Sequence, residues 1–380
     1  MRITYLFDRP LPATETDSEQ AIQTIAALAR QGARVTLVLP CSRAKPPDAD
    51  AIRAYYCVQG DFAVHGVAQP LMAQQDARKW WHALFARSRA VGSDVLYTRN
   101  FPTLFAAATA PQPYAYETYR PWFDQFPPLR VPFRAALSRP HCLGAVLHSA
   151  YASERYAALG VARERLAVVH NGYDPELLRR APERAQARRE LGLPADRPIV
   201  AYTGHVNATK GLETILRLAE RTPEALFLLV GHDGKAGIIE RLARRVENVE
   251  LVAWQPFERV AYYLKAADVL LLPPSDRGLA LIGNTVLPMK LFQYLAAARP
   301  ILAPRTPDLV ELLRDDENAR LVPPGDLDAA TSALAALLSD AALRERLARG
   351  AQQSSRDLTW DARARKILGF LERRLTALPS

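Results

Sequence analysis

The sequence predicts an α/β protein with two Rossmann-like, doubly wound domains, and two observations lead to this prediction. Short unbroken apolar runs, typical of strands in a buried parallel sheet, alternate with amphipathic stretches typical of helices. The chain has 380 residues, more than a single hydrophobic core usually organises, and a charged, proline-containing stretch at 171–198 interrupts the alternation. Because such sheets bind ligands at the carboxyl ends of their strands, we expect the two domains to face a shared cleft.

The first domain is expected at residues 1–170. The run RITYLF is predicted to be its first strand, and residues 18–31 its first helix, because Ile22, Ile25 and Leu28 fall on one face. Gly32 suits the C-cap of that helix. The other elements expected here are strands at 35–39, 95–97, 114–116, 145–147 and 167–169 and helices at 76–89 and 102–110.

Residues 171–198 are expected to form a linker with a short helix at 183–191. The alternation resumes in the second domain, expected at 199–360. Its strands are predicted at 199–203, 225–230, 249–251, 269–272, 300–303 and 319–322, and its helices at 211–221, 235–245, 257–266, 289–297, 306–314 and 327–349. A last helix, within residues 361–380, is expected to pack back on the first domain.

The composition excludes several classes of protein. Lys and Arg number 49 and Asp and Glu 40, a net charge of +9, and 49% of the residues are apolar, so the chain is not disordered. Its three cysteines form no CxxC pair or zinc-ligand array, which favours a reducing compartment. No apolar run approaches the roughly 20 residues of a membrane helix. Asp8 interrupts the apolar N-terminus, so we expect no signal peptide and a cytoplasmic protein.

The segment YTGHVNATKG at 202–211 has the composition of an anion site. A buried strand ends at Thr203, Gly204 permits close backbone approach, and Lys210 and Gly211 open a helix. Amide groups at a helix N-terminus, its dipole and a lysine then converge on one point. Lysine is rare in this chain, seven against 42 arginines, which favours a specific role for Lys210. The alternative is a glycine turn followed by a solvated lysine.

Two other loops carry polar residues that suit a ligand. A long glycine-containing loop follows the strand at 269–272, and Lys290 lies in the first turn of the next helix, where a cation opposes the dipole unless an anion is near. Its alternative is a surface loop with an extended lysine. The loop after the first strand contains Thr16, Asp17 and Ser18, and we expect it on the acceptor side of the cleft. Asp17 or Ser18 can cap the helix that follows, and plain capping is the alternative to contact with an acceptor.

These segments resemble the family 4 glycosyltransferases of the GT-B fold. The resemblance is strong from residue 170 onward and weaker before it. It rests on HNGYD at 170–174, YTGHVNATKG at 202–211, VGHDG at 230–234, VAWQP at 252–256, AADVLLLPPS at 266–275, LPMKLFQYLAAARPILA at 287–303 and LTWDARARKIL at 358–368.

The resemblance implies a nucleotide diphosphate sugar, UDP- or GDP-linked, as donor, and neither a metal nor another cofactor. It makes Lys210 the cation that neutralises the diphosphate, with His205 and the acceptor-domain Tyr119 as the other catalytic residues. It implies donor-binding roles for Gly204, Gly231, Trp254, Gln255, Gly283, Asn284, Thr285, Lys290 and Gln293. Thr285 and Gln293 stand where the family carries the two glutamates of its E-x7-E motif, His205 where it carries an arginine, and Tyr119 where it carries a histidine.

The resulting hypothesis is a retaining glycosyltransferase that acts on a glycan, lipid-linked or small-molecule hydroxyl in cell-surface polysaccharide synthesis. The departures at His205, Tyr119 and Gln293 motivate a first alternative, a nucleotide-sugar-binding protein without catalysis. A second is a GT-B sugar-nucleotide epimerase, which would need acid and base side chains next to the sugar.

An anionic membrane is a further expected partner. Residues 77–89 and 120–139 combine tryptophan, phenylalanine and arginine, and the chain through His170 holds 19 bases against 13 acids. Aromatic and basic side chains together suit the membrane interface, so we expect peripheral contact with the inner face of the membrane. The alternative is core aromatic residues beside solvated arginines. No nucleic-acid-binding module is recognisable, so nucleic acid is not an expected partner.

Overall fold

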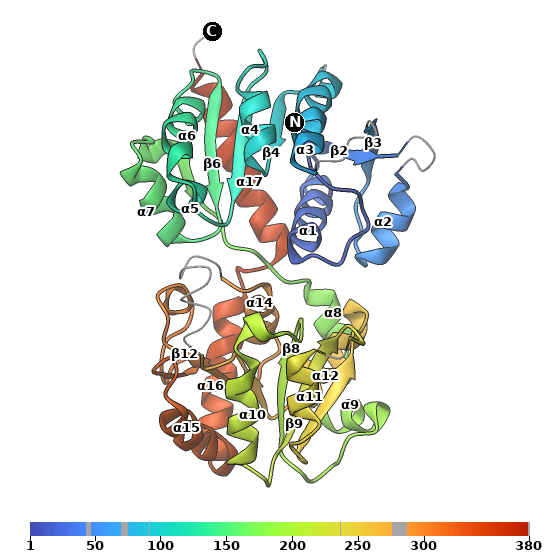
Figure 1. Ribbon diagram of the computed structural model, residues 1–380, viewed down its shortest axis with the longest axis vertical. Coiled ribbons are helices and arrows are strands. Elements are labelled where there is room, and N and C mark those ends of the chain that lie inside the picture. The colour runs from blue at the N-terminus through green and yellow to red at the C-terminus, as the bar shows by residue number, and fades with distance from the viewer. Residues whose placement is uncertain (43–46, 70–74, 91, 236, 276–286, 379–380) are drawn as a thin grey trace. The chain divides into compact units, whose positions relative to one another are not determined.

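A computed structural model of the chain describes residues 1–380 except 43–46, 70–74, 91, 236, 276–286 and 379–380. The chain divides into two compact units (Figure 1). Unit 1 comprises Met1–Asn171 together with Trp360–Ser380, and unit 2 comprises Gly172–Thr359. Each unit holds one parallel sheet between helices, as the sequence predicts.

Unit 1 has a seven-stranded sheet in the order β3-β2-β1-β4-β5-β6-β7, with every described pairing parallel. Its strands are β1 (Arg2–Leu6), β2 (Arg34–Cys41), β3 (Phe62–Ala68), β4 (Val95–Thr98), β5 (Tyr114–Thr118), β6 (Cys142–Leu147) and β7 (Leu166–Val168). Its helices are α1 (Thr16–Arg30), α2 (Ala49–Tyr55), α3 (Gln75–Ala86), α4 (Phe101–Ala107), α5 (Trp122–Gln125), α6 (Arg130–Leu137), α7 (Ala150–Ala158) and α17 (Trp360–Thr376). Since β4, β5 and β6 are buried along their whole length, both faces of the sheet are covered.

Unit 2 has a six-stranded parallel sheet in the order β10-β9-β8-β11-β12-β13. Its strands are β8 (Ile199–Thr203), β9 (Leu226–His232), β10 (Val249–Ala253), β11 (Val269–Leu271), β12 (Ile301–Pro304) and β13 (Arg320–Val322). Its helices are α8 (Pro175–Arg180), α9 (Arg184–Leu191), α10 (Leu212–Glu220), α11 (Ile238–Ala243), α12 (Phe257–Ala266), α14 (Met289–Ala296), α15 (Leu327–Ser339) and α16 (Ala341–Ser355). Two apolar clusters, one on each face of the sheet, form its core.

The segment expected as a linker, 171–198, belongs almost entirely to unit 2. Helices α8 and α9 pack on α12. The buried Arg188 of α9 donates to the carbonyl of Ala266 at 3.0 Å and to Asp268 at 2.6 Å. Asp268 in turn accepts the amide of Ile199 at 2.8 Å, which fixes the start of β8. The charged residues of this segment are therefore part of the packing of unit 2.

The last helix, α17, returns to unit 1 and packs against α1, where Arg30 and Asp361 form an ion pair of 2.7 Å. The two places where the chain passes between the units lie near 171 and 359. There Tyr173 pairs with Thr359, and the Tyr173 amide donates to the carbonyl of Leu358 at 3.0 Å. The outgoing and returning strands of the connection are thus tied together within unit 2.

Several predicted elements need correction. Helix α2, strand β3 and helix α6 did not emerge from the sequence pattern, and the helix expected at 306–314 is only a 3-10 turn at Leu309–Glu311. The helix expected at 327–349 is two helices. Asp340 ends the first, and its side chain caps the second by accepting the amide of Leu343 at 2.9 Å.

Candidate functional site

Three predicted donor-binding residues meet at the carboxyl edge of the sheet of unit 2. Strand β8 ends at Thr203, and the chain turns at Gly204 with a φ of 126°, a conformation that favours glycine. A Cβ at Gly204 would lie 2.6 Å from Nζ of Lys290, which comes from the first turn of α14. A Cβ at Gly231, on the neighbouring β9, would lie 2.7 Å from the Gly204 carbonyl oxygen. Both glycines are therefore required for the close approach of these backbones and of the lysine.

Two lysines, Lys210 and Lys290, share this region. Lys210 ends a 3-10 turn, Ala208–Lys210, that leads through Gly211 into α10. Loss of hydration lowers the pKa of Lys210, although part of its side chain is exposed. Burial lowers the pKa of Lys290 well below its usual range, and the charge of Lys210 lowers it further. No acidic side chain of the described residues contributes to either shift, so the pair is electrostatically set to receive an anion.

The residues expected near the nucleotide lie in turns on the same edge of the sheet. The carbonyl of His205 accepts the hydroxyl of Tyr202 at 3.0 Å. The amide of Trp254 donates to the carbonyl of His232 at 2.9 Å, and its indole is 44% exposed. Gln255 donates its side-chain amide to Ala253 within its own turn, at 3.2 Å. The Trp254 side chain is therefore partly exposed on this edge, whereas the Gln255 amide is already used.

The second motif lies only partly within the described residues. Gln293 is half-buried, one helical turn after Lys290 on α14. Gly283, Asn284 and Thr285 lie outside the described residues. A cavity of about 280 Å³ lies beside the loop after β9, and none of the predicted site residues lines it. Its lining comprises His232, Gly234, Lys235, Glu240, Ala243, Arg244, Val249 and Leu251.

The predicted residues of the first domain all lie in unit 1. Thr16, Asp17 and Ser18 belong to the first turn of α1, because that helix begins two residues earlier than expected. The N-cap is Glu15, so the expectation that Asp17 or Ser18 caps this helix is wrong. Asp17 pairs with Arg9 at 3.0 Å, and Ser18 is buried. Tyr119 follows β5, half-buried, with the Arg120 guanidinium stacked 4.6 Å from its ring centre.

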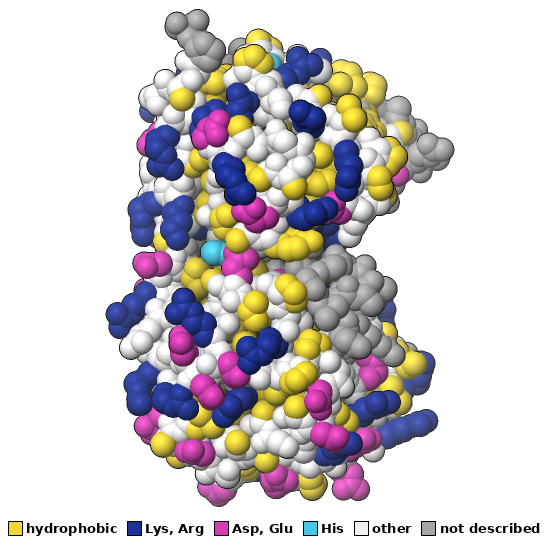
Figure 2. All heavy atoms as spheres, turned by 90° about the vertical axis from the view of Figure 1, so that its left-hand side faces the viewer, with side chains coloured by type: hydrophobic (Ala, Val, Ile, Leu, Met, Phe, Trp, Pro, Cys, Tyr) yellow, Lys and Arg dark blue, Asp and Glu magenta, His cyan; other side chains and the backbone are white. Residues whose placement is uncertain are grey.

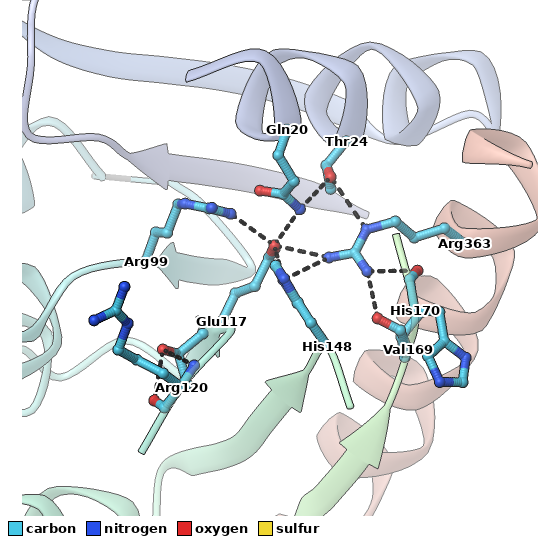
Figure 3. Close-up of polar contacts among 10 residues, drawn as sticks. Gln20, Thr24, Arg99, Glu117, Arg120, His148, Val169, His170 and Arg363 are labelled. Atoms are coloured by element: carbon cyan, nitrogen blue, oxygen red, sulfur yellow. Dashed lines mark hydrogen bonds and ion pairs between the residues drawn. The ribbon is translucent and has the colours of Figure 1, made fainter. Parts of the chain in front are cut away.

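A buried charge cluster in unit 1 was missed by the sequence analysis. Figure 3 shows side chains from α1, from α17 and from the ends of β4 and β6 converging on Glu117 of β5. One oxygen, Oε1, accepts from Arg99 at 3.0 Å, from Gln20 at 2.6 Å and from Arg363 at 2.7 Å, and lies 2.8 Å from Nε2 of His148. Arg363, from α17, also donates to the carbonyls of Val169 and His170, just before the chain leaves unit 1.

This Glu117 cluster holds its charges in a fixed arrangement. Burial alone would raise the pKa of Glu117, but the charges of Arg363 and Arg99 and the hydrogen bond with His148 outweigh it and hold that pKa well below its usual range. Burial lowers the pKa of His148 to about 4, against its hydrogen bond with Glu117, so the imidazole is neutral at pH 7. Glu117 was identifiable in principle, because a lone acid in the apolar strand YAYET requires a buried cation.

Two general observations bear on the chemistry available. Among the residues that the structure describes, no group of three His, Cys, Asp or Glu side chains is placed to hold a metal ion. Within the same residues, no helix combines the length and the apolar character needed to cross a bilayer.

Comparison with known proteins identifies the family. The model described as "Glycosyl transferases group 1" matches residues 183–354, and the model described as "Glycosyltransferase Family 4" matches residues 19–177. The chain belongs to the family 4, group 1 glycosyltransferases. The family's group 1 model spans the two lysines and both glycines of the site in unit 2, and its family 4 model spans Glu117 and Tyr119. The prediction of a family 4 glycosyltransferase with two Rossmann-like domains is therefore confirmed.

Individual relatives agree with this family. A D-inositol 3-phosphate glycosyltransferase of Xylanimonas cellulosilytica is 30% identical over 222 residues, and the match covers 55% of this chain and 51% of that protein. A second, from Streptomyces avermitilis, is 28% identical over 218 residues, 53% of this chain and 45% of that protein. The chain thus spans about half the length of the curated relatives it matches.

Solved structures share the fold along the whole chain. The sucrose-phosphate synthase of Thermosynechococcus elongatus has a TM-score of 0.77 at 20% identity, with all of both chains covered. HepE of Anabaena, solved in complex with UDP-glucose, has a TM-score of 0.72 at 18% identity, with 98% of this chain and all of that chain covered. At these identities the likeness concerns the fold of the family.

Proposed function

We propose that this protein is a retaining glycosyltransferase that transfers a sugar from a nucleotide diphosphate sugar to a hydroxyl group of a glycan or lipid-linked acceptor. The observation that carries the proposal is the pair Lys210 and Lys290, whose charges act on each other and of which Lys290 lies beside Gly204. No acidic side chain among the described residues offsets these two cations, and they lie at the edge of the sheet of unit 2 where α/β folds bind ligands. A diphosphate supplies the missing negative charge.

The reaction follows from that electrostatic arrangement. The bond between the anomeric carbon and the diphosphate oxygen breaks, and the acceptor oxygen forms its bond to the same carbon on the same face. The configuration of the sugar is retained because the acceptor attacks the face from which the diphosphate leaves, and the acceptor proton passes to the departing phosphate. Lys210 and Lys290 stabilise the charge that develops on the leaving diphosphate, and fixed charges of this kind contribute strongly to catalysis.

The direct test replaces Lys210 by alanine. We expect a loss in kcat of about 100- to 1000-fold, the range seen when one group that stabilises developing charge is removed. Lys366, exposed on α17, is the matched control, and its replacement by alanine should leave turnover unchanged. Sugar transfer from UDP-glucose and from GDP-mannose would be followed by mass spectrometry with a panel of glycan and lipid-linked acceptors. Wild-type turnover by Lys210→Ala would refute the proposed role.

The same assays separate the two alternative functions. Conversion of the donor to a different nucleotide sugar without any acceptor would identify an epimerase. Calorimetric binding of UDP or GDP with no transfer or hydrolysis would identify a nucleotide-sugar-binding protein. UDP is the first nucleotide to try, since HepE, which shares this fold, was solved with UDP and with UDP-glucose.

We further propose that unit 1 contacts an anionic membrane at the inner face, where a lipid-linked acceptor in polysaccharide synthesis would be presented. Trp80 and Phe126 are 41% and 51% exposed. Ring contacts connect them across three helices, from Trp80 to Phe101 at 6.4 Å, from Phe101 to Trp122 at 6.2 Å and from Trp122 to Phe126 at 6.4 Å. The aromatic residues of this region therefore form a continuous strip that includes exposed rings.

Other aromatic residues of 120–139 belong to the core, as the alternative interpretation expects. Phe123 and Phe133 are buried in the apolar core of unit 1. Figure 2 shows basic side chains spread over one face of the molecule with acidic ones between them, so net charge alone does not mark a binding surface. The proposal of membrane contact therefore rests on the aromatic strip from Trp80 to Phe126. Sedimentation with phosphatidylglycerol vesicles should pull down the wild-type protein, and Trp80→Ser with Phe126→Ser should weaken binding at least fivefold. Equal binding of the double variant would refute it.

A further inference from the structure

Tyr202 makes two contacts that a core side chain does not need. Its ring lies on β8, almost fully buried, at the last position but one before Gly204. The ammonium of Lys290 lies 3.6 Å from the centre of that ring. The hydroxyl of the same side chain donates to the carbonyl of His205 at 3.0 Å. One residue thus contacts both the buried lysine and the turn that follows the strand.

The ring contact compensates in part for the position of Lys290. Burial and the nearby charge of Lys210 both disfavour a cation here, and no acidic side chain of the described residues offsets them. The negative face of an aromatic ring attracts an ammonium, and the attraction grows when water is excluded. Because a Cβ at Gly204 would lie 2.6 Å from Nζ, the ammonium has a narrow seat between the ring and the glycine backbone.

We infer that Tyr202 is a positioning residue for the donor diphosphate. Its ring holds the Lys290 ammonium beside Gly204, and its hydroxyl fixes the His205 carbonyl, so that Lys210 and Lys290 present two cations to one diphosphate. The inference rests on the proposed function, since it assigns the diphosphate as the ligand. Leucine or phenylalanine would fill the apolar space on β8 as well as tyrosine does, so packing alone does not account for both polar contacts.

The test separates positioning from packing by comparing ligands. Tyr202→Leu removes the ring and the hydroxyl, Tyr202→Phe keeps the ring, and Lys290→Met removes the cation. We expect Tyr202→Leu to weaken UDP binding about 2- to 30-fold, the equivalent of one cation–π contact. Uridine, which lacks the phosphates, should bind all variants alike. Tyr202→Phe should lose much less affinity for UDP than Tyr202→Leu.

A double-mutant cycle gives the decisive result. In the Lys290→Met background, Tyr202→Leu should cause no further loss of UDP affinity, because the ring then has no ammonium to hold. Tyr263→Leu, at a buried tyrosine of α12, is the matched control, and it should leave UDP affinity unchanged. Circular dichroism melts confirm that each variant is folded. An equal loss in both backgrounds, or an equal loss for uridine, would overturn the inference.

Inorganic pyrophosphate distinguishes failure of this inference from failure of the proposed function. If pyrophosphate binding depends on Tyr202 and Lys290 while no sugar is transferred, the inference stands and the proposed transferase activity fails. If sugar is transferred but Tyr202→Leu binds UDP and pyrophosphate as the wild type does, the inference fails and the proposed function stands. If neither pyrophosphate nor UDP binds the wild type, both are overturned.

Discussion

Replacement of Arg363 by glutamine should destabilise unit 1 far more than any exposed substitution on α17. The guanidinium donates to Glu117 at 2.7 Å, to the carbonyl of His170 at 2.8 Å, to the carbonyl of Val169, and to Thr24 at 3.2 Å. Arg363 and Glu117 are both buried, so the substitution removes a cation from a carboxylate that water cannot reach.

The expected loss follows from what remains around Glu117. Removal of one partner of a buried ion pair costs about 3–5 kcal/mol. Arg99 and His148 still contact Oε1 of Glu117 in the variant, so we expect the lower end, about 3 kcal/mol. Domains are stable by only about 5–15 kcal/mol, so this is a large share of the total. For a unit of this size the melting temperature should fall by roughly 6–12 °C.

Urea unfolding followed by tryptophan emission measures this loss. Trp80, Trp81, Trp122 and Trp360 belong to unit 1 and only Trp254 to unit 2, so the signal reports mainly on unit 1. Arg365→Gln, at an exposed arginine of the same helix, should change the free energy of unfolding by less than about 0.5 kcal/mol. Glu117→Gln combined with Arg363→Gln should cost less than the sum of the two single substitutions. A loss below about 1 kcal/mol for Arg363→Gln, or strict additivity, would refute the reasoning.

Three other predictions concern charge and backbone. Lys290→Met should raise the free energy of unfolding of unit 2 by about 0.5–2 kcal/mol at pH 7 in calorimetry, because it removes a buried ammonium, while it weakens UDP binding; a destabilised variant would contradict this. The pKa of His148 is about 4 in the folded protein against about 6.5 unfolded, so the unfolded chain takes up the proton first. Stability of unit 1 should therefore fall as the pH drops from 6.5 to 4, by roughly 3 kcal/mol from this group, and His148→Gln should flatten that slope in urea titrations. Gly204→Ala should lose UDP binding by at least tenfold in calorimetry, because the residue has a φ of 126° and its Cβ would clash with Lys290; unchanged affinity would show that the lysine moves without cost.

The sequence could predict that Gly204, Gly231 and Lys290 lie close together, because the short pattern around each residue indicates a strand end or a helix start. Gly204 follows β8 and Gly231 lies near the end of β9, two strands of one parallel sheet, and Lys290 lies in the first turn of α14. Parallel strands bring such positions to one edge, so sequence order and strand pattern suffice.

The Glu117 cluster could not be predicted in the same way. Its Arg363 lies 246 residues from Glu117 along the chain and is one of 42 arginines, with nothing in its local sequence to distinguish it. The start of α1 was misplaced by two residues for a related reason. Glu15 makes no side-chain cap, so the capping pattern at Asp17 and Ser18 gave the wrong boundary.

The Glu117 cluster and the lysine pair near Gly204 differ in how their charges are paired, and this difference distinguishes a structural site from a binding site better than the number of charges does. Around Glu117, every cation has a carboxylate or carbonyl partner within 3.2 Å, and the pKa of the acid is held low by those partners. The charges of this cluster are paired with one another and stabilise the fold. At Gly204 the opposite holds, since burial lowers the pKa of both lysines with no acid among the described residues to compensate. Burying an ammonium without an acidic partner destabilises the charged form, and binding of an anion offsets that loss of free energy. We therefore propose that the ligand binds at the two lysines, which no acid of the described residues offsets, and not at the more heavily charged cluster around Glu117.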